Sequence, residues 1–287
     1  MRTATTVEGS GGNWPEIIEF VCEAEKLGLD ICWVAEAWGT DAPSPLGYLA
    51  ARTGTMLLGS AVIQVGTRSP VLIAQTAMTL AHLSGGRFLL GLGVSGPQVI
   101  EGLHGVPFAH PLARMRETAQ IVRSVFAGDR VSFQGTQYRI PLAGSESRPM
   151  RVSVPPVSVP VYLAALSPKM LELTGELADG WLGTSFVPEG AAAYFEPLDA
   201  GLARSGRTRA DLDICQGAEV GTRPAWRRPW PAGRGNWPFP SAAWGRRPRT
   251  STTTPTAARA GPRSPPGSAS AGRPATAPAP PPWSPTR

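Results

Sequence analysis

The fold is decided by the stretch MLLGSAVIQVGTRSPVLIAQTAMTLAHLSGGRFLLGL at residues 56–92. It consists of an apolar run, a predicted helix and a second apolar run, at 56–65, 70–83 and 87–92. Ser69 is a favoured N-cap, Pro70 is a favoured first helical residue, and Gly85 ends the helix. Two short apolar runs around a helix are typical of a βαβ unit, so this stretch predicts two parallel strands buried on both faces.

The same alternation continues on both sides of this stretch. Further strands are predicted at 2–7, 31–35, 159–164, 181–184 and 212–220, further helices at 13–27, 45–52, 112–127, 168–177 and 189–204, and a hairpin at 131–140. A doubly wound nucleotide-binding sheet would normally carry a G-x-G-x-x-G fingerprint after its first strand, and residues 8–12 lack that spacing. The pattern therefore predicts an α/β fold, a (β/α)8 TIM barrel that is incomplete at about seven strands.

The composition changes abruptly near residue 220. Residues 221–287 hold 11 of the 27 basic residues, none of the 21 acidic residues, 16 of the 31 Pro, and no Leu, Ile, Val or Met. The barrel domain at 1–220 therefore has a net charge of −5, although the whole chain has +6. A segment without aliphatic side chains cannot bury enough surface to offset the entropy of ordering it. We expect residues 221–287 to form a disordered, low-complexity Arg/Pro/Ala-rich tail.

Three interpretations of this tail remain open. It is a basic segment that binds acidic partners, nucleic acid included, or a plain linker, or the product of a frameshift. GC-rich coding DNA read out of frame yields Arg, Pro, Ala, Gly, Ser, Thr and Trp. Five of the nine Trp residues lie in the tail, which is unusual for a natural linker and favours the frameshift.

The composition also excludes several classes of protein. No apolar stretch reaches about 18 residues, so we expect no transmembrane helix and no membrane partner. The polar N-terminus lacks the apolar region of a secretory signal. Cys22, Cys32 and Cys215 show no C-x-x-C spacing, and the three His residues show no H-E-x-x-H motif, so neither disulfides nor a metal site is expected. A cytoplasmic protein is predicted, with no nucleic-acid partner unless through the tail.

Function in such barrels lies at the carboxyl ends of the strands. Glu36 ends the second predicted strand within an apolar run, an environment that can adapt a carboxyl group to proton transfer. The alternative is that it accepts hydrogen bonds from the backbone of its loop. Trp38 either stacks on a ring-shaped ligand or closes the mouth of the barrel.

Three other groups of residues lie at strand ends. Gln64 ends the third strand. Gly93 and Ser95 follow the fourth strand in a Gly-rich run that is a weak phosphate motif, or serves only for close packing. Ala165, Leu166 and Ser167 follow the fifth strand, where free backbone amides at a helix N-terminus attract anions. The alternative for Ser167 is an ordinary N-cap.

Six runs carry a resemblance to a known family: VAEAWGTDA (34–42), LLGSAVIQVGTRSP (57–70), LAHLSGGRFLLGLGVSGPQVIEG (80–102), PLARMRE (111–117), VYLAALSPKMLELTGELADGWLGT (161–184) and DICQGAEV (213–220). Together they resemble the bacterial luciferase-like flavin-dependent oxidoreductases. The branch that they resemble most uses the deazaflavin coenzyme F420. The resemblance covers residues 1–220.

The resemblance implies a (β/α)8 barrel, a homodimer, and hydride transfer between reduced deazaflavin and a small organic substrate. It implies a catalytic role for Glu36, as an acid/base or a ring-orienting group, and a non-proline cis peptide at Ala61–Val62 behind the ring. The full set of cofactor-binding residues expected is Trp38, Ala61, Val62, Gln64, Gly93, Ser95, Ala165, Leu166 and Ser167. Leu166 and Ser167 stand where some relatives have two glycines.

The sequence also departs from one branch of the family. The sugar-phosphate dehydrogenases have a catalytic histidine where this chain has Ala37. They also have a glutamate just past the glycines of the fourth strand, where this chain has Gly96-Pro97. Their substrate is therefore not expected here. Two alternatives stay open: an FMN-dependent luciferase-like monooxygenase, and an inactive truncated or frameshifted remnant with a basic tail.

Overall fold

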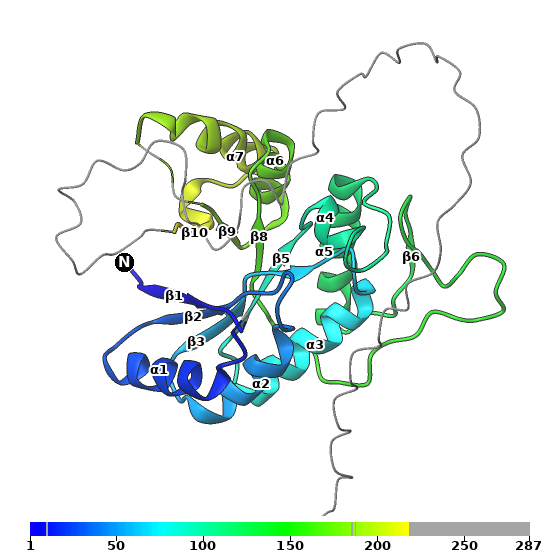
Figure 1. Cartoon of the computed structure of the whole chain (residues 1–287). Coiled ribbons are helices and arrows are strands. Elements are labelled where there is room, and N and C mark those ends of the chain that lie inside the picture. The colour runs from blue at the N-terminus through cyan, green and yellow to red at the C-terminus, as the bar shows by residue number, and fades with distance from the viewer. Residues whose placement is uncertain (10, 185, 187, 218–287) are drawn as a thin grey trace, which may run out of the picture. The chain divides into compact units, whose positions relative to one another are not determined.

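The computed structural model describes residues 1–9, 11–184, 186 and 188–217, which all belong to one compact unit. Its parallel strands form a curled sheet in the order β1–β2–β3–β5–β8–β9–β10, with β4 paired to β5 (Figure 1). The strands are β1 (Ala4–Val7), β2 (Ile31–Val34), β3 (Leu57–Ser60), β4 (Ile63–Gln64), β5 (Phe88–Gly93), β8 (Val161–Ala164), β9 (Gly180–Leu182) and β10 (Asp213–Cys215). The predicted incomplete barrel of seven strands is confirmed. Its predicted boundary at 220 and the tail at 221–287 lie outside the described residues.

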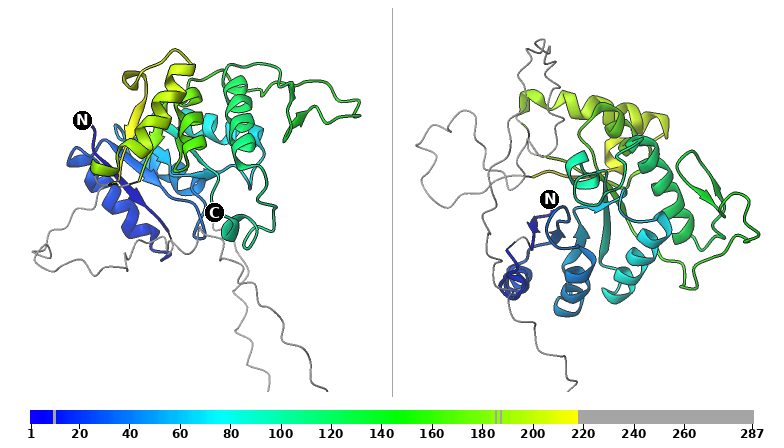
Figure 2. Two further views of the ribbon diagram at one scale, coloured as in Figure 1. Left: turned by 90° about the horizontal axis from the view of Figure 1, so that it is seen from above. Right: turned by 45° about the vertical axis from the view of Figure 1, so that its right-hand side comes forward.

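Helices follow the strands around the outside of the sheet (Figure 2). They are α1 (Trp14–Lys26), α2 (Pro43–Arg52), α3 (Pro70–Leu83), α4 (Pro97–Ile100), α5 (Pro111–Phe126), α6 (Pro168–Leu177) and α7 (Ala192–Arg204). The Ser69 hydroxyl accepts a hydrogen bond from the Leu72 amide and caps α3 as predicted. The short helix α4, in the loop after β5, was not predicted. None of the helices in the described ranges is long and apolar enough to cross a membrane.

The interior of the curled sheet is filled by two aromatic side chains that lie on glycines of neighbouring strands. Trp33 and Tyr162 are almost fully buried, and their rings meet edge to face with centroids 5.3 Å apart. A Cβ atom at Gly59 would lie 2.2 Å from the Trp33 ring, and one at Gly180 would lie 2.1 Å from the Tyr162 ring. Interiors of this density leave no room for both a large ring and a neighbouring side chain.

A polar contact joins the two edges of the sheet within the described residues. The Arg2 guanidinium, just before β1, pairs with the carboxylate of Asp213 at the start of β10. The Tyr162 hydroxyl donates to the same carboxylate oxygen. Burial and the neighbouring Asp213 carboxylate both raise the pKa of Tyr162, so its hydroxyl stays a donor. The amino ends of the strands are therefore tied across the space between β1 and β10.

The third predicted strand, 56–65, is broken in the structure. β3 ends at Ser60 and β4 begins at Ile63, and the Ala61–Val62 peptide bond between them is cis. The cis bond that the family resemblance implied is confirmed. On the two sides of the break the pairing differs: β3 pairs with both β2 and β5, whereas β4 pairs with β5.

Two glutamates organise loops on the outside of the barrel. The Glu117 carboxylate on α5 accepts hydrogen bonds from the Thr136, Gln137 and Tyr138 amides at 2.8–2.9 Å, in the turn between β6 (Phe133–Gln134) and β7 (Arg139–Ile140). Glu25 accepts amide hydrogen bonds from the 54–56 loop in the same way. Burial works to raise both pKa values, but these hydrogen bonds outweigh it, so the pKa of each carboxyl lies below its usual range.

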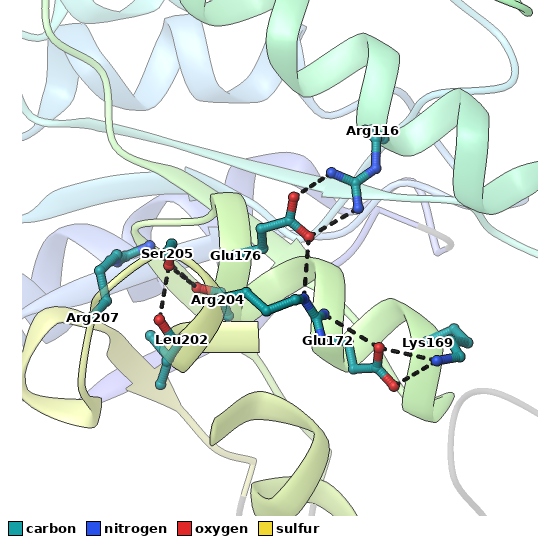
Figure 3. A network of polar contacts seen from close by, with 9 residues as sticks. Arg116, Lys169, Glu172, Glu176, Leu202, Arg204, Ser205 and Arg207 are labelled. Carbon is teal, nitrogen blue, oxygen red and sulfur yellow. Dashed lines mark hydrogen bonds and ion pairs between the residues drawn. The ribbon is translucent and has the colours of Figure 1, made fainter. Parts of the chain in front are cut away.

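Helices α6 and α7 pack backbone to backbone. A Cβ atom at Gly201 of α7 would lie 2.0 Å from the Glu172 carbonyl oxygen of α6. A polar network spans the same region (Figure 3): Arg204 contacts Glu172 and Glu176 at 3.2 and 3.9 Å, and Arg116 of α5 also pairs with Glu176. These partly exposed ion pairs add little stability, so the glycine contact sets the helix spacing.

Stability is expected to fall in acid because both loop-holding carboxylates have lowered pKa values. Their contribution is complete above the ordinary glutamate pKa of about 4.5 and is lost as the pH falls through the lowered values. Urea midpoints measured between about pH 5 and pH 3 should show a smaller drop for Glu25→Gln and Glu117→Gln than for wild type. Glu189→Gln, at an exposed position, is the control. An equal drop in all four proteins would contradict this assignment.

Gly201→Ala should destabilise the protein by about 2 kcal/mol or more, because the added methyl group meets backbone that cannot move aside. The matched control is Gly47→Ala within α2, where the new Cβ atom would meet only Leu80, at 3.9 Å. That change should stabilise by about 0.5–1 kcal/mol through helix propensity. Urea unfolding of both variants checks the pair, and a neutral Gly201→Ala would contradict the close packing.

Candidate active site

Glu36 lies directly beyond β2 and is held by an arginine from another loop. Arg68, between β4 and α3, binds both carboxylate oxygens of Glu36, with its Nη2 atom 3.0 Å from Oε2. The Ala42 amide donates to the same Oε2 at 2.9 Å. The Glu36 side chain is 8% exposed and that of Arg68 20% exposed, so the pair is largely shielded from water. The alternative interpretation, a carboxylate that accepts from its loop backbone, is matched by the Ala42 contact. The catalytic role stays a prediction.

Gln64, at the end of β4, links this pair to the sheet. Its Nε2 group donates to the carbonyl oxygens of Glu36 and Ala37 at 3.4 and 3.2 Å. Its Oε1 atom is buried and has no hydrogen-bond partner in the part of the chain that the structure describes. A buried acceptor without a partner costs stability unless a ligand or water supplies a donor.

The loop after β5 supplies a second buried polar atom of this kind. Within the described ranges the Ser95 hydroxyl is buried and without a partner, and Ser95 adopts the left-handed backbone conformation, with φ 59°. Non-glycine residues in this conformation concentrate at ligand sites. Gly93 lies opposite Gln64 in the register of β4 and β5. A Cβ atom added at Gly93 would lie 2.2 Å from the Val62 side chain. Close packing therefore accounts for Gly93, as one of its two interpretations proposed.

The loop after β8 leads into α6 and presents its backbone. The Trp181 indole donates to the Ala165 carbonyl oxygen at 3.0 Å and fixes the start of this loop. Ser167 is the N-cap residue of α6, but its side chain makes no capping hydrogen bond. Leu166 is exposed and Ala165 is buried. The first-turn amides of α6 thus lie at the same end of the sheet as Glu36 and Gln64, because all the strands are parallel.

Trp38 lies at the rim of this end and is 37% exposed. With Ala35, Thr40 and Gly9 it lines a small hollow between the loops after β1 and β2. A larger hollow, about 370 Å³, lies at the opposite end of the barrel around Phe126 and Val157. That hollow lies on the face that carries stability in such barrels, so we place the functional site at the carboxyl end.

The structure therefore brings Glu36, Gln64 and Ser95 to one end of the sheet, as predicted from the strand ends. Arg68 was missed, because it lies four residues beyond the strand end, in a loop. Its position just before Ser69-Pro70, inside a run quoted for the family resemblance, was the available signal. Within the described ranges, no group of three or more His, Cys, Asp or Glu residues is arranged to hold a metal ion.

A family model described as "luciferase-like monooxygenase" matches residues 2–225. The chain is 44% identical over 211 residues to the "putative coenzyme F420-dependent oxidoreductase Rv3520c" of Mycobacterium tuberculosis, covering 70% of this chain and 61% of that protein. It is 34% identical over 199 residues to the 5,10-methylenetetrahydromethanopterin reductase of Archaeoglobus fulgidus, covering 69% of this chain and 58% of that protein. The chain thus spans about three fifths of the length of these relatives.

Solved structures share the fold. An F420-dependent secondary alcohol dehydrogenase in complex with an F420-acetone adduct superposes with a TM-score of 0.67 at 18% identity, over 75% of this chain and 68% of that chain. The coenzyme F420-dependent tetrahydromethanopterin reductase of Methanopyrus kandleri gives 0.65 at 21% identity, over 75% and 65% of the two chains. The resemblance stated from the sequence is confirmed: the chain belongs to the luciferase-like monooxygenase family.

Proposed function

We propose that this protein is an oxidoreductase that binds coenzyme F420 at the carboxyl ends of its strands and exchanges a hydride with a small organic substrate. Relatives named for F420 support the cofactor, with identities of 44% for one and 32% for an F420-dependent glucose-6-phosphate dehydrogenase of Microbacterium testaceum. The structural observation that carries the proposal is the place of Gln64 Oε1 and Ser95 Oγ, which are both buried at this end of the barrel without a partner among the described residues.

The donor set of this end fits a deazaflavin. A bound deazaflavin supplies hydride chemistry at its ring, and the protein supplies binding and orientation. Gln64 Oε1 would accept a hydrogen bond from a ligand N–H group, because its Nε2 group is already committed to two carbonyl oxygens. Ser95 Oγ can donate or accept. Trp38, at the rim, would cover a ring, and the Ala61–Val62 bulge would support it from behind.

Residues 165–167 would hold a phosphate group. The first-turn amides of α6 carry the positive end of the helix dipole, and Ser167 leaves them uncapped by its side chain. Because of these amides, we expect the contacts to a phosphate to come from the backbone and not from side chains. Leu166 carries a side chain where glycine would allow a closer backbone approach. A cytoplasmic location and a homodimer remain predictions of the family resemblance.

The second candidate function is that of an FMN-dependent monooxygenase, which the description of the matching family favours. A fold neighbour of this kind is the oxygenating constituent of 3,6-diketocamphane monooxygenase in complex with FMN, with a TM-score of 0.62 at 14% identity. The same strand ends would bind the isoalloxazine ring, so the two candidates differ in cofactor and in reaction with oxygen.

Fluorescence titration of the purified full chain separates these candidates. We expect micromolar or tighter binding of coenzyme F420 and at least tenfold weaker binding of FMN. Micromolar binding of FMN without binding of F420 would replace the proposed function by the monooxygenase. A folded chain that binds neither cofactor would support the truncated, inactive remnant.

Glu36→Gln should weaken F420 binding by about tenfold, since the neutral amide cannot satisfy both nitrogens of Arg68 and leaves the guanidinium without a counter-ion. Glu19→Gln is the control, because Glu19 forms an exposed ion pair with Arg52 on the outer face. Binding is measured by deazaflavin fluorescence and folding by thermal denaturation. Unchanged affinity in Glu36→Gln would remove Glu36 from the site.

A further inference from the structure

We infer that Arg68 is a positioning residue that holds Glu36 as a fixed hydrogen-bond acceptor for the bound deazaflavin or its substrate. The inference rests on the proposed function and deepens it, because it decides between the two roles left open for Glu36. Under it, Glu36 orients a donor on the ligand and does not deliver a proton.

The first step is the count of acceptor positions on Glu36. A carboxylate offers about four lone-pair directions. Arg68 takes one on each oxygen, and the Ala42 amide takes a second on Oε2. Counting the described residues, one direction on Oε1 therefore stays open to a donor from a ligand.

The second step is the charge of the pair. A guanidinium stays protonated under all ordinary conditions and can only donate. Both Glu36 oxygens accept from this one guanidinium, so the two planar groups fix each other's orientation. The pair is charge-assisted, and the low exposure of both side chains, 8% and 20%, limits competition from water.

The third step is the support of the arginine itself. Arg68 directly precedes Ser69, whose side chain caps α3, and follows Thr67, whose hydroxyl donates to the Gln64 carbonyl oxygen at 3.2 Å. Gln64 in turn donates to the Glu36 carbonyl oxygen. The loop after β4 thus fixes both the backbone and the side chain of Glu36, which is the support that a well-defined ligand contact needs.

The test is a double-mutant cycle with two ligands, F420 and its phosphate-free, riboflavin-level deazaflavin. Affinities and bound-state absorption spectra are measured for wild type, Arg68→Gln, Arg68→Lys, Glu36→Gln and Arg68→Gln/Glu36→Gln. Arg68→Gln should weaken both ligands by the same factor, about tenfold or more, and should shift the bound spectrum, whereas Arg68→Lys should lose less. The double variant should bind as well as Glu36→Gln alone.

Three results of this binding cycle would overturn the inference. The first is unchanged affinity in Arg68→Gln, and the second is a loss of affinity confined to the phosphate-bearing ligand, which would mean that Arg68 binds phosphate directly. The third is that Arg68→Gln weakens binding as much in the Glu36→Gln background as it does in wild type. Thermal melting of each variant, with Arg52→Gln as a matched ion-pair control on the outer face, separates binding from unfolding.

A ligand-free readout distinguishes failure of the positioning role from failure of the proposed function. Hydrogen exchange of the Ala42 amide should accelerate in Arg68→Gln, because the freed Glu36 carboxylate no longer holds that amide in place. If the wild-type protein bound no deazaflavin, the proposed function would be wrong, and the exchange rate of the Ala42 amide would still test the positioning role. Equal exchange rates in wild type and Arg68→Gln would overturn the positioning role.

Discussion

The packing of Trp33 and Tyr162 inside the curled sheet is the constraint on which the rest of the structure depends. Each ring occupies the space that a side chain at Gly59 or Gly180 would need. Filled in this way, the interior is closely packed, and the strands curve around it. The strand ends can then carry polar groups whose relative positions are set by a rigid scaffold.

The two ends of the sheet have different roles. At the amino end, Arg2, Asp213 and Tyr162 satisfy one another and serve the fold. At the carboxyl end, Gln64 and Ser95 retain buried polar atoms that no protein group satisfies among the described residues. Trp33, Thr40 and Thr118 also bury a polar atom without a partner among the described residues, so it is the place of Gln64 and Ser95, at the end where such barrels bind ligands, that is consistent with a site there. Glu36 is satisfied only in part. Arg68 and the Ala42 amide use most of its acceptor capacity, and one direction on Oε1 stays open among the described residues.

The sequence predicted the elements that carry strong local signals. Ser69-Pro70 and Gly85-Gly86 bracket α3 at its observed ends, and the alternation of apolar runs and helices predicted the seven strands. The break between β3 and β4 followed only from the family resemblance, since an apolar run looks the same whether or not one of its peptide bonds is cis. Helix α4 is too short for periodicity to detect.

The candidate site was predicted in part for the same physical reasons. Glu36 and Gln64 lie at strand ends, where a rule about barrels points directly at them. Arg68 acts from a loop, and its pairing with Glu36 spans 32 residues of sequence, which no local pattern encodes. Glu117 was missed likewise, because its role depends on contacts with the turn of the next hairpin, 19–21 residues further along the chain.

The contact between Arg2 and Asp213 has a consequence for how the chain folds during synthesis. The two residues are 211 positions apart, so the first strand leaves the ribosome long before its partner across the barrel exists. In the described structure β1 pairs with β2 alone, so until residue 213 emerges the Arg2 guanidinium lacks its Asp213 partner across the barrel. Such long-range contacts slow folding, because the entropy of closing the loop is spent before the contact forms. The nascent chain therefore lacks this contact across the barrel until nearly all of the described residues have been synthesised.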